Sequence, residues 1–336
     1  MEQVLQSFRA MGTAGAVAQV IKPACGRPKD LAHAPEVLEG RTVGVEISGW
    51  LHRACKRGAK EVCEHGVSKE AVLYVTQRLS ALMGEGARVV AVFDGDRSFA
   101  AKADTQEKRR LNQVRLLAAA GMHSTKYFQA KATPQEPLLK AIMAWCIANS
   151  CGVLVAAYEA DQQLVDLQQQ GRIDTILVGS NDSDLTIYGG TDCIYDYDPV
   201  ARTCFHVRLL EDILISSPLD GAMNFNGWVY DRLLVLCLLS GHDYLPPIKG
   251  SGLKTVFKLM QRTALPPHLC LAPNACHPPL PERPDAWQTE HAIRFFAIGF
   301  LAAKLTPSEV EPHFQRLLMA YYAVRHHPVF RLTNAG

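Results

Sequence analysis

Residues 174–190 read DTILVGSNDSDLTIYGG, which places a short apolar run directly before two acids. The run from Ile176 to Val178 has the composition of a buried β-strand. Asp182 and Asp184 follow at the point where that strand would end. Ligands of parallel α/β sheets bind beyond the carboxyl ends of the strands. The stretch therefore predicts a strand of a parallel sheet with two carboxylates at its functional edge.

Three other segments share this strand-like character, and helical patterns lie between them. Together with the first, the predicted strands cover residues 42–48, 88–95, 152–158 and 174–180. Apolar residues recur at positions 72, 75, 79, 82 and 83, which is the spacing of one helix face. Strands that alternate with helices predict an α/β fold, with a mostly parallel central sheet and helices on both faces.

A further helix is expected to begin next to Thr133. Thr133 and Glu136 have the spacing of a capping box, and Pro134 suits the first helical position. The apolar stripe of this helix would consist of Leu138, Leu139, Ile142, Met143 and Cys146.

Each of the four predicted strands is followed by one or two carboxylates. The set comprises Glu46, Asp94, Glu159, Asp161, Asp182 and Asp184. A single such acid is usually a helix N-cap or a turn residue, but that does not explain four strands in a row. Like charges repel unless a cation neutralises them, and oxygen-only ligands suit Mg²⁺ or Mn²⁺. Because one Mg²⁺ cannot use six carboxylates, the pattern predicts a two-metal site, a recurrent solution for phosphodiester hydrolysis.

Length and composition restrict the function only loosely. The 336 residues are 48% hydrophobic, enough for one large domain or two small ones, and the net charge of +2 is uninformative. The ten cysteines form no CxxC pair and are typical of reduced cysteines in an intracellular protein. No apolar run approaches the roughly 20 residues of a membrane span, so no membrane association is expected.

One cluster of His and Cys lies in a Pro-rich loop at residues 265–284. It consists of His268, Cys270, Cys276 and His277. The spacing fits no common zinc pattern, so a plain loop is the main interpretation and a metal site the alternative.

Five sequence blocks together resemble a known family. Residues 158–167, 179–190 and 238–255 read YEADQQLVDL, GSNDSDLTIYGG and LLSGHDYLPPIKGSGLKT, and they are similar to signature blocks of the flap endonuclease / 5′-nuclease superfamily. VGVEISGWLHRA and VVAVFDG supply two more blocks. The resemblance runs from Met11, where MGTAG is similar to the family's start, to about Phe330, and it is nearest to the exonuclease 1 branch.

The resemblance implies a domain organisation. Residues 1–10 would be an N-terminal extension, and residues 11–336 a single 5′-nuclease catalytic domain with a PIN-like core. Within this domain, the resemblance implies a helical arch at about residues 97–135 and a helix–two-turn–helix element at about residues 231–262.

The resemblance also implies ions. The block SGHDYLP supplies a seventh acid, Asp243. The seven acids would hold two Mg²⁺ ions, for which Mn²⁺ can substitute, and the helix–two-turn–helix loop would order a K⁺ ion.

Basic residues are concentrated between residues 97 and 140, with nine Lys or Arg against three Asp or Glu. A solvated helix face is the plain interpretation, but a cationic helix beside an acidic metal site is suited to clamp phosphate. The resemblance implies that Lys102 and Arg109 reach the scissile phosphate from the arch. A one-residue insertion upstream leaves Lys108 or Arg110 as alternatives.

A second basic stretch, residues 248–262, contains four Lys or Arg and no acid. Its glycines allow the backbone to approach a phosphate, and the helix that follows offers its N-terminal amides. The resemblance implies that Lys249, Gly250, Gly252 and Lys254 contact the duplex backbone.

Several positions depart from the family pattern. Glu46 stands where the family usually has Asp, and Ser48 where it often has an aromatic residue. The extra methylene of Glu46 moves its carboxylate and puts full activity in question. His52 is expected either to stack near a displaced nucleotide or to lie in the core, and Trp50 is assigned to the core.

These features predict a metal-dependent 5′ nuclease, monomeric and nuclear, acting on double-stranded DNA with a 5′ end, nick, gap or flap. The acid-poor start of the chain leaves a mitochondrial location as the alternative. Two rival functions stay open: a nuclease-fold scaffold impaired by Glu46, and an RNA-directed 5′ nuclease, because backbone contacts do not read the base.

Overall fold

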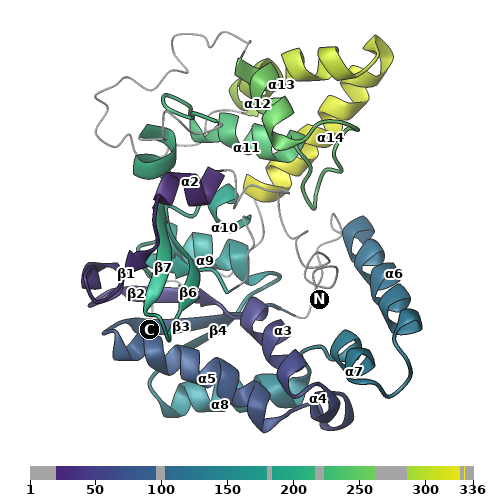
Figure 1. Cartoon of the computed structure of the whole chain (residues 1–336). Helices are drawn as coiled ribbons and strands as arrows, with labels where there is room; N and C mark the ends of the chain where they lie inside the picture. The colour runs from purple at the N-terminus through teal and green to yellow at the C-terminus, as the bar shows by residue number, and fades with distance from the viewer. Residues whose placement is uncertain are drawn as a thin grey trace. The chain divides into compact units, whose positions relative to one another are not determined.

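The computed structural model describes residues 20–95, 103–179, 184–215, 223–261, 286–325 and 329. The chain divides into two compact units (Figure 1). The sheet unit contains residues 28–181, 192–206 and 328–336. The helical unit contains residues 1–27, 182–191 and 207–327. Each unit is considered by itself below.

A seven-stranded sheet organises the sheet unit, in the order β1-β7-β6-β5-β2-β3-β4. Its strands are β1 Lys29–Asp30, β2 Thr42–Glu46, β3 Arg88–Phe93, β4 Gly152–Val155, β5 Thr175–Leu177, β6 Asp192–Asp198 and β7 Thr203–Arg208. β2 pairs in parallel with β3 and β5, β3 with β4, and β5 with β6. β1 and β7 pair in antiparallel orientation. The predicted, mostly parallel sheet is therefore confirmed, with β2 to β5 as its centre.

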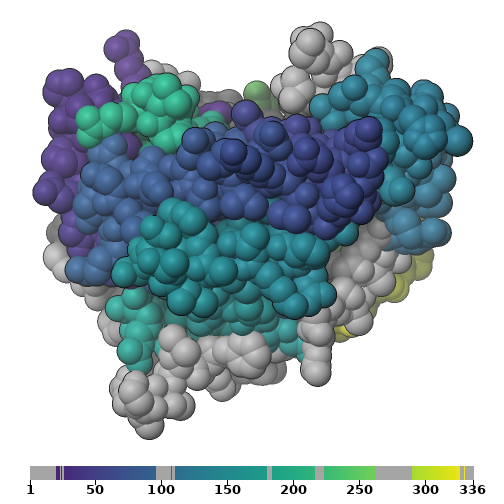
Figure 2. Space-filling model, turned by 90° about the horizontal axis from the view of Figure 1, so that it is seen from below, coloured from purple at the N-terminus to yellow at the C-terminus, as the bar shows by residue number. Residues whose placement is uncertain are grey.

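Helices cover both faces of this sheet. They include α5 Lys69–Gly84, α8 Glu136–Ala148 and α9 Ala160–Gln169. The unit also contains α3 Ser48–Arg57, α4 Ala59–His65, α6 Ala103–Ala119, α7 Thr125–Lys131 and the 3₁₀ turn Pro35–Val37. Val43 and Val45 of β2 pack in one core with α5 and α8, and Figure 2 shows α4, α5 and α8 as a continuous outer surface on that side. Gly44 faces the other way, where an added Cβ would lie 2.6 Å from Leu164 of α9. The alternation follows the two-residue period of a strand.

The start of α8 differs from the prediction. The helix begins at Glu136 with Gln135 as its N-cap, and Thr133 lies outside it. If Thr133 were the N-cap, Pro137 would occupy the first position whose N–H donates within the helix, and proline has no N–H. Beginning two residues later places Pro137 in the first turn, where no donor is needed. Leu138, Ile142 and Cys146 of the predicted apolar stripe are buried.

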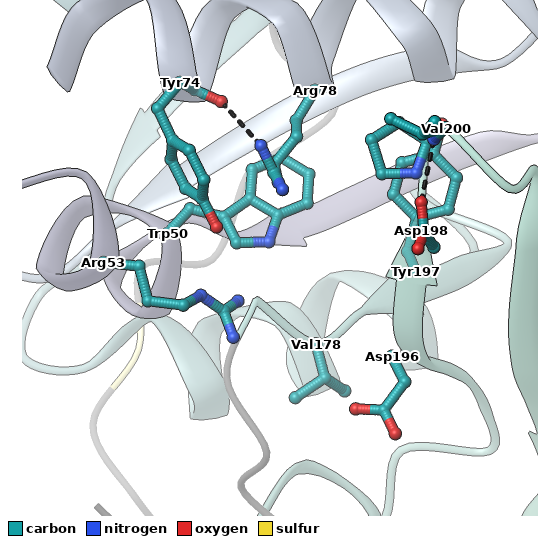
Figure 3. A pocket seen from close by; sticks show the side chains of 10 residues that line it. Trp50, Arg53, Tyr74, Arg78, Val178, Asp196, Tyr197, Asp198 and Val200 are labelled. Carbon is teal, nitrogen blue, oxygen red and sulfur yellow. Dashed lines mark hydrogen bonds between the residues drawn. The ribbon is translucent and has the colours of Figure 1, made fainter. Parts of the chain in front are cut away.

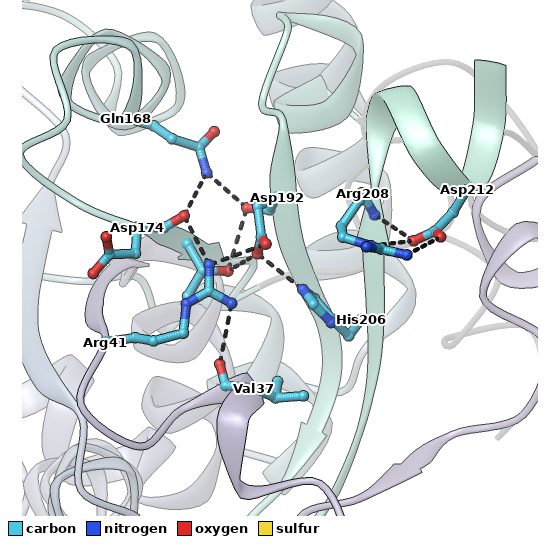
Figure 4. A network of polar contacts seen from close by, with 9 residues as sticks. Val37, Arg41, Gln168, Asp174, Asp192, His206, Arg208 and Asp212 are labelled. Atoms are coloured by element: carbon cyan, nitrogen blue, oxygen red, sulfur yellow. Dashed lines mark hydrogen bonds and ion pairs between the residues drawn. The ribbon is translucent and has the colours of Figure 1, made fainter. Parts of the chain in front are cut away.

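A polar network fixes the start of β6 (Figure 4). The Asp192 carboxylate lies 3.0 Å from an Arg41 guanidinium nitrogen and 3.0 Å from His206 Nε2, and it accepts a hydrogen bond from the Thr175 hydroxyl. These partners lie before β2, on β7 and on β5, so one side chain ties together strands that are distant in sequence.

The helical unit consists of α2 Lys22–Cys25, α10 Asp184–Ile187, the π-helix η4 Leu209–Ile215, α11 Tyr230–Leu239, α12 Leu253–Gln261, α13 Ala286–Lys304 and α14 Pro307–Arg325. Residues 232–239 of α11 are all buried. Arg232 lies 4.0 Å from the centre of the Trp228 ring and donates to the Met260 carbonyl at 2.8 Å. This contact joins α11 to the end of α12. No described helix has the length and apolar character that a membrane crossing requires.

Candidate active site

Glu46 and Asp94 follow neighbouring strands of the sheet unit. β2 and β3 run parallel with Glu46 opposite Val92, so both acids belong to the carboxyl edge. Glu46 is only 5% exposed, and its Oε1 accepts the Gly49 N–H at 2.9 Å. Its other oxygen, Oε2, is buried and has no hydrogen-bond partner among the described residues. A buried carboxylate oxygen without a donor is costly, and a cation would relieve that cost.

The electrostatics of Glu46 agree with a cation site. Burial raises the pKa of Glu46 to about 7, and the negative charge of Asp94 adds to this rise. Asp94 is itself held by two donors: the Ser48 hydroxyl at 2.5 Å and the Ala160 N–H at 2.8 Å. Ser48, which departs from the family pattern, therefore orients a neighbouring candidate ligand.

The hydrogen bond from Ala160 also places the start of α9 beside Asp94. Glu159 is the N-cap residue of α9, and Asp161 lies in its first turn. The Gln162 side-chain amide donates to Glu159 Oε2 at 3.3 Å. Asp94 and the acids at the start of α9 thus follow the adjacent strands β3 and β4, as the sequence pattern predicts.

The end of β5 lies against Glu46. A Cβ added to Gly179 would lie 1.9 Å from the Glu46 carbonyl oxygen, so only glycine permits this approach. The Arg53 guanidinium donates to the Gly179 carbonyl. Asp182, three residues further on, lies outside the described residues.

In the helical unit, Asp184 begins α10 and is 1% exposed. The Tyr188 hydroxyl donates to its Oδ2 at 3.2 Å, and His242 Nε2 lies 3.2 Å from its Oδ1. His242 precedes the predicted ligand Asp243, in a tight turn closed by two backbone hydrogen bonds between His242 and Leu245. The structure thus brings Asp184 to the block that contains Asp243. Sequence reasoning missed His242, although its position directly before a candidate ligand was an available signal.

The predicted arch residues are only partly described. The part of the predicted arch from Ala103 to Ala119 forms α6. Lys102 and the side chains of Lys108 and Arg109 lie outside the described part of the chain. Arg110 forms a two-pronged ion pair with Glu107, with both nitrogen–oxygen distances at 2.8 Å. This pairing makes Arg110 a weaker candidate for a phosphate contact.

The second basic stretch forms the loop before α12 and the helix itself. Gly250 has a φ of 75°, which favours glycine, and its carbonyl accepts from Lys304 Nζ at 3.3 Å. A Cβ on Gly252 would meet nothing within 4 Å. α12 buries Leu253, Val256, Phe257 and Met260, whereas Lys249, Lys254 and Lys258 are exposed. The lysine side chains are thus accessible to solvent.

His52 and Trp50 both lie on α3 but differ in solvent exposure. Trp50 is 2% exposed, as expected of a core residue. His52 is exposed, so the alternative that it belongs to the core is wrong.

Comparisons with known proteins agree with these features. Residues 12–115 match the model of the XPG N-terminal domain, and residues 151–243 match that of the XPG I-region. The chain belongs to the flap endonuclease / 5′-nuclease superfamily.

Curated relatives of this 5′-nuclease chain include exonuclease 1 of Oryza sativa subsp. japonica, 28% identical over 68% of this chain and 27% of that protein. Exodeoxyribonuclease 1 of Saccharomyces cerevisiae is 28% identical over 67% of this chain and 32% of that protein. The chain thus matches about a third or less of the length of these relatives, whose names agree with the predicted exonuclease 1 branch.

A solved structure, the catalytic core of Rad2 in complex with DNA substrate, has the same fold. Its TM-score is 0.58 at 16% identity, covering 96% of this chain and 88% of that one. At this identity the similarity supports the 5′-nuclease fold alone.

The predicted metal ligands are divided between the two units. Glu46, Asp94, Glu159 and Asp161 belong to the sheet unit, and Asp182, Asp184 and Asp243 to the helical unit. Among the residues that the structure describes, no three His, Cys, Asp or Glu side chains are close enough to hold a metal ion. The seven-acid ligand set therefore stays a prediction, with the buried Oε2 of Glu46 as its best structural support. The four residues of the alternative zinc cluster lie outside the described chain.

Proposed function

We propose that this protein is a metal-dependent, structure-specific 5′ nuclease that hydrolyses phosphodiester bonds in duplex DNA with a 5′ end, nick, gap or flap. The observation that carries the proposal is the Glu46–Asp94 pair, in which a buried carboxylate oxygen lacks a donor beside a second acid at the carboxyl edge of a parallel sheet. The exonuclease 1 names of the relatives support the same activity. A role in DNA repair or replication in the nucleus follows from it.

The seven acids Glu46, Asp94, Glu159, Asp161, Asp182, Asp184 and Asp243 would hold two Mg²⁺ ions. When bound, such ions stabilise charge on the phosphoryl oxygens and lower the pKa of a water that attacks the phosphorus. The protein's own part is to hold the carboxylates in place. Ser48 and the Ala160 N–H orient Asp94, the Gly49 N–H orients Glu46, and the Tyr188 hydroxyl orients Asp184.

The basic residues would have two separate roles, in stabilising charge and in binding the duplex. Lys102 and Arg109 would add positive charge at the scissile phosphate, where charge develops during reaction. Lys249 and Lys254, with the backbone at Gly250 and Gly252, would hold the duplex some distance away, and a K⁺ ion bound by the loop carbonyls would order this grip. Exposed His52 would stack on the displaced nucleotide.

One structural observation favours a second function, a scaffold that binds nucleic acid without cutting it. Glu46 is longer than aspartate, and its Oε1 is already committed to the Gly49 N–H. If the remaining oxygen does not reach an ion, the site would bind metal poorly.

A cleavage assay separates these functions and the RNA-directed alternative. Wild type, Asp94→Ala and the control Glu61→Gln, an exposed acid on α4, are incubated with Mg²⁺ or Mn²⁺ and 5′-flap, nicked, blunt and RNA substrates. We expect the wild type and the control to cut flap or nicked DNA and Asp94→Ala to be inactive. Cleavage of RNA alone would replace the DNA assignment, and inactivity of the wild type on every substrate would favour the scaffold.

A further inference from the structure

The sheet unit contains a pocket of about 410 Å³ that the predicted nuclease site does not use (Figure 3). α3 contributes Trp50 and Arg53, and α5 contributes Tyr74 and Arg78. The opposite wall consists of Val178 after β5 and of residues 196–200, the end of β6 and the turn that follows. The volume lies within the range of about 300–1,000 Å³ that is typical of small-molecule sites.

Two arginines line one side of this pocket. The Arg78 guanidinium lies 3.7 Å from the centre of the Tyr74 ring and donates to the Tyr74 carbonyl at 3.2 Å. Arg53 donates to the Gly179 carbonyl. Within the described chain, neither arginine forms an ion pair with a carboxylate. A guanidinium has five N–H donors, so each arginine keeps donors for a ligand.

The arginines are held close enough to repel each other. Burial lowers the pKa of Arg78, and the charges of Arg53 and Arg57 act in the same direction, while Tyr74 and Asp198 oppose them. Like charges that share a cavity repel, and an anion bound between them relieves this repulsion. The planar fork of arginine is suited to phosphate in particular.

The opposite wall supplies acceptors and rings. Asp196 adopts a left-handed backbone with φ of 48°, an uncommon conformation that is often found at binding sites. Asp198 holds the turn through its Oδ1, which accepts the N–H groups of Val200 at 2.8 Å and Ala201 at 3.0 Å. The hydroxyl of Tyr197 is buried and has no hydrogen-bond partner among the described residues. The pocket thus presents cations on one wall and acceptors on the other.

We propose that this pocket binds one nucleotide, with its phosphate at Arg53 and Arg78 and the amino group of its base at Asp196 or Asp198. The phosphate matches the two guanidinium groups, and an exocyclic amine matches the carboxylates. The choice of a nucleotide rests on the proposed function, which supplies two sources of this chemistry: a nucleotide within a bound DNA strand and a free 5′-mononucleotide.

Binding measured in EDTA tests the proposal apart from metal-dependent cleavage. The affinity of wild type, Arg78→Gln and Arg57→Gln is measured for dAMP, dCMP, dTMP and a 5′-flap duplex. Arg57 is the matched control, because it lies 4.6 Å from the same Tyr74 ring but does not line the pocket. We expect Arg78→Gln to weaken dAMP and dCMP binding about tenfold or more, the scale for losing a charge-assisted hydrogen bond. Arg57→Gln should bind like the wild type, and dTMP, which lacks an amino group, should bind more weakly.

The outcomes distinguish the two sources. If Arg78→Gln weakens the duplex and no mononucleotide binds the wild type, the pocket holds a nucleotide within a strand. If Arg78→Gln weakens the binding of mononucleotides but not of the duplex, the pocket binds the free nucleotide. Equal binding of dTMP and dAMP would overturn the role of the acids.

A second variant guards against misfolding. Arg53 is exposed, so Arg53→Gln should fold even if the melting temperature of Arg78→Gln falls. Wild-type affinity of both variants for all ligands would overturn the nucleotide site. Cleavage of the flap duplex with Mg²⁺ is recorded in parallel. If the variants bind like the wild type and the wild type cleaves, the nucleotide site is refuted and the nuclease function is kept. If the wild type binds nucleotides through Arg78 but does not cleave, the nuclease function is refuted and the nucleotide site is kept.

Discussion

The Gly179 backbone lies against Glu46 so closely that an added methyl group would be 1.9 Å from the Glu46 carbonyl oxygen and 3.0 Å from its Oε2. The first overlap is with backbone, so no side-chain rotation relieves it. Gly179→Ala should therefore displace the end of β2 or β5, and we expect a loss of about 1–3 kcal/mol in unfolding free energy, with slower cleavage. Gly84→Ala is the control, because its Cβ would meet nothing within 4 Å. Urea unfolding checks both, and equal stability of the two variants would refute the close contact.

Asp94 and Asp184 are both proposed ligands but differ in burial. Asp94 is exposed, whereas Asp184 is buried with His242 and Tyr188. Alanine at either position should abolish cleavage while duplex binding stays nearly intact. Only Asp184→Ala should also lose about 1–3 kcal/mol of stability, because it removes a buried acceptor of the Tyr188 hydroxyl. Cleavage and thermal unfolding are measured on the same preparations. Near wild-type cleavage by either variant would remove that residue from the ligand set.

The Asp192 network predicts an acid-dependent stability. Although burial acts to raise it, the pKa of Asp192 is lowered by the hydrogen bonds and charges of His206, Thr175 and Arg41. The ionised form is thus favoured in the folded state. Its contribution is complete above the ordinary Asp pKa of about 4 and is lost as the pH falls through the lowered folded-state value.

Asp192→Asn should therefore lose about 1–3 kcal/mol at pH 7 and show a flatter decline in stability between about pH 5 and pH 3. The control is Asp212→Asn, which removes the exposed pair with Arg208 seen in Figure 4 and should cost less than about 1 kcal/mol. Denaturant unfolding across this pH range is the measurement. Identical pH profiles for wild type and Asp192→Asn would show that the network does not stabilise the ionised acid.

The exposed lysine face of α12 predicts a duplex grip. Lys254→Ala should weaken duplex binding and lower its salt slope by about one unit, because one phosphate contact is lost. Gly252→Val should weaken binding without loss of stability, since the space around that Cβ is open. Lys140→Ala, whose partner is Glu136 on α8, is the control for charge alone. Equal losses on single-stranded and duplex DNA would argue against a duplex contact.

The sequence pattern predicted the central strands and the edge at which Glu46, Asp94 and the start of α9 lie, because buried parallel strands and the residues that end them are local features. It placed the start of α8 wrongly because a helix capped by Thr133 would need the backbone N–H of residue 137 as its first donor, and Pro137 has none. His242 was missed although it directly precedes the candidate ligand Asp243. The Arg53–Arg78 pocket could not be predicted, since it depends on side chains from segments that only the folded chain brings together. The left-handed backbone of Asp196 has no sequence signal either.

We propose that this chain binds divalent metal through Glu46 and its neighbours in order to cut DNA. Single-turnover cleavage of a 5′-flap duplex, with Mg²⁺ and Mn²⁺ titrated against wild type and Glu46→Asp, tests it most directly. Mg²⁺ demands near-ideal octahedral geometry and tolerates a misplaced carboxylate poorly. We predict that the wild type cleaves with both ions but better with Mn²⁺, and that Glu46→Asp gains Mg²⁺-dependent cleavage. No cleavage by either form with either ion would contradict the claim.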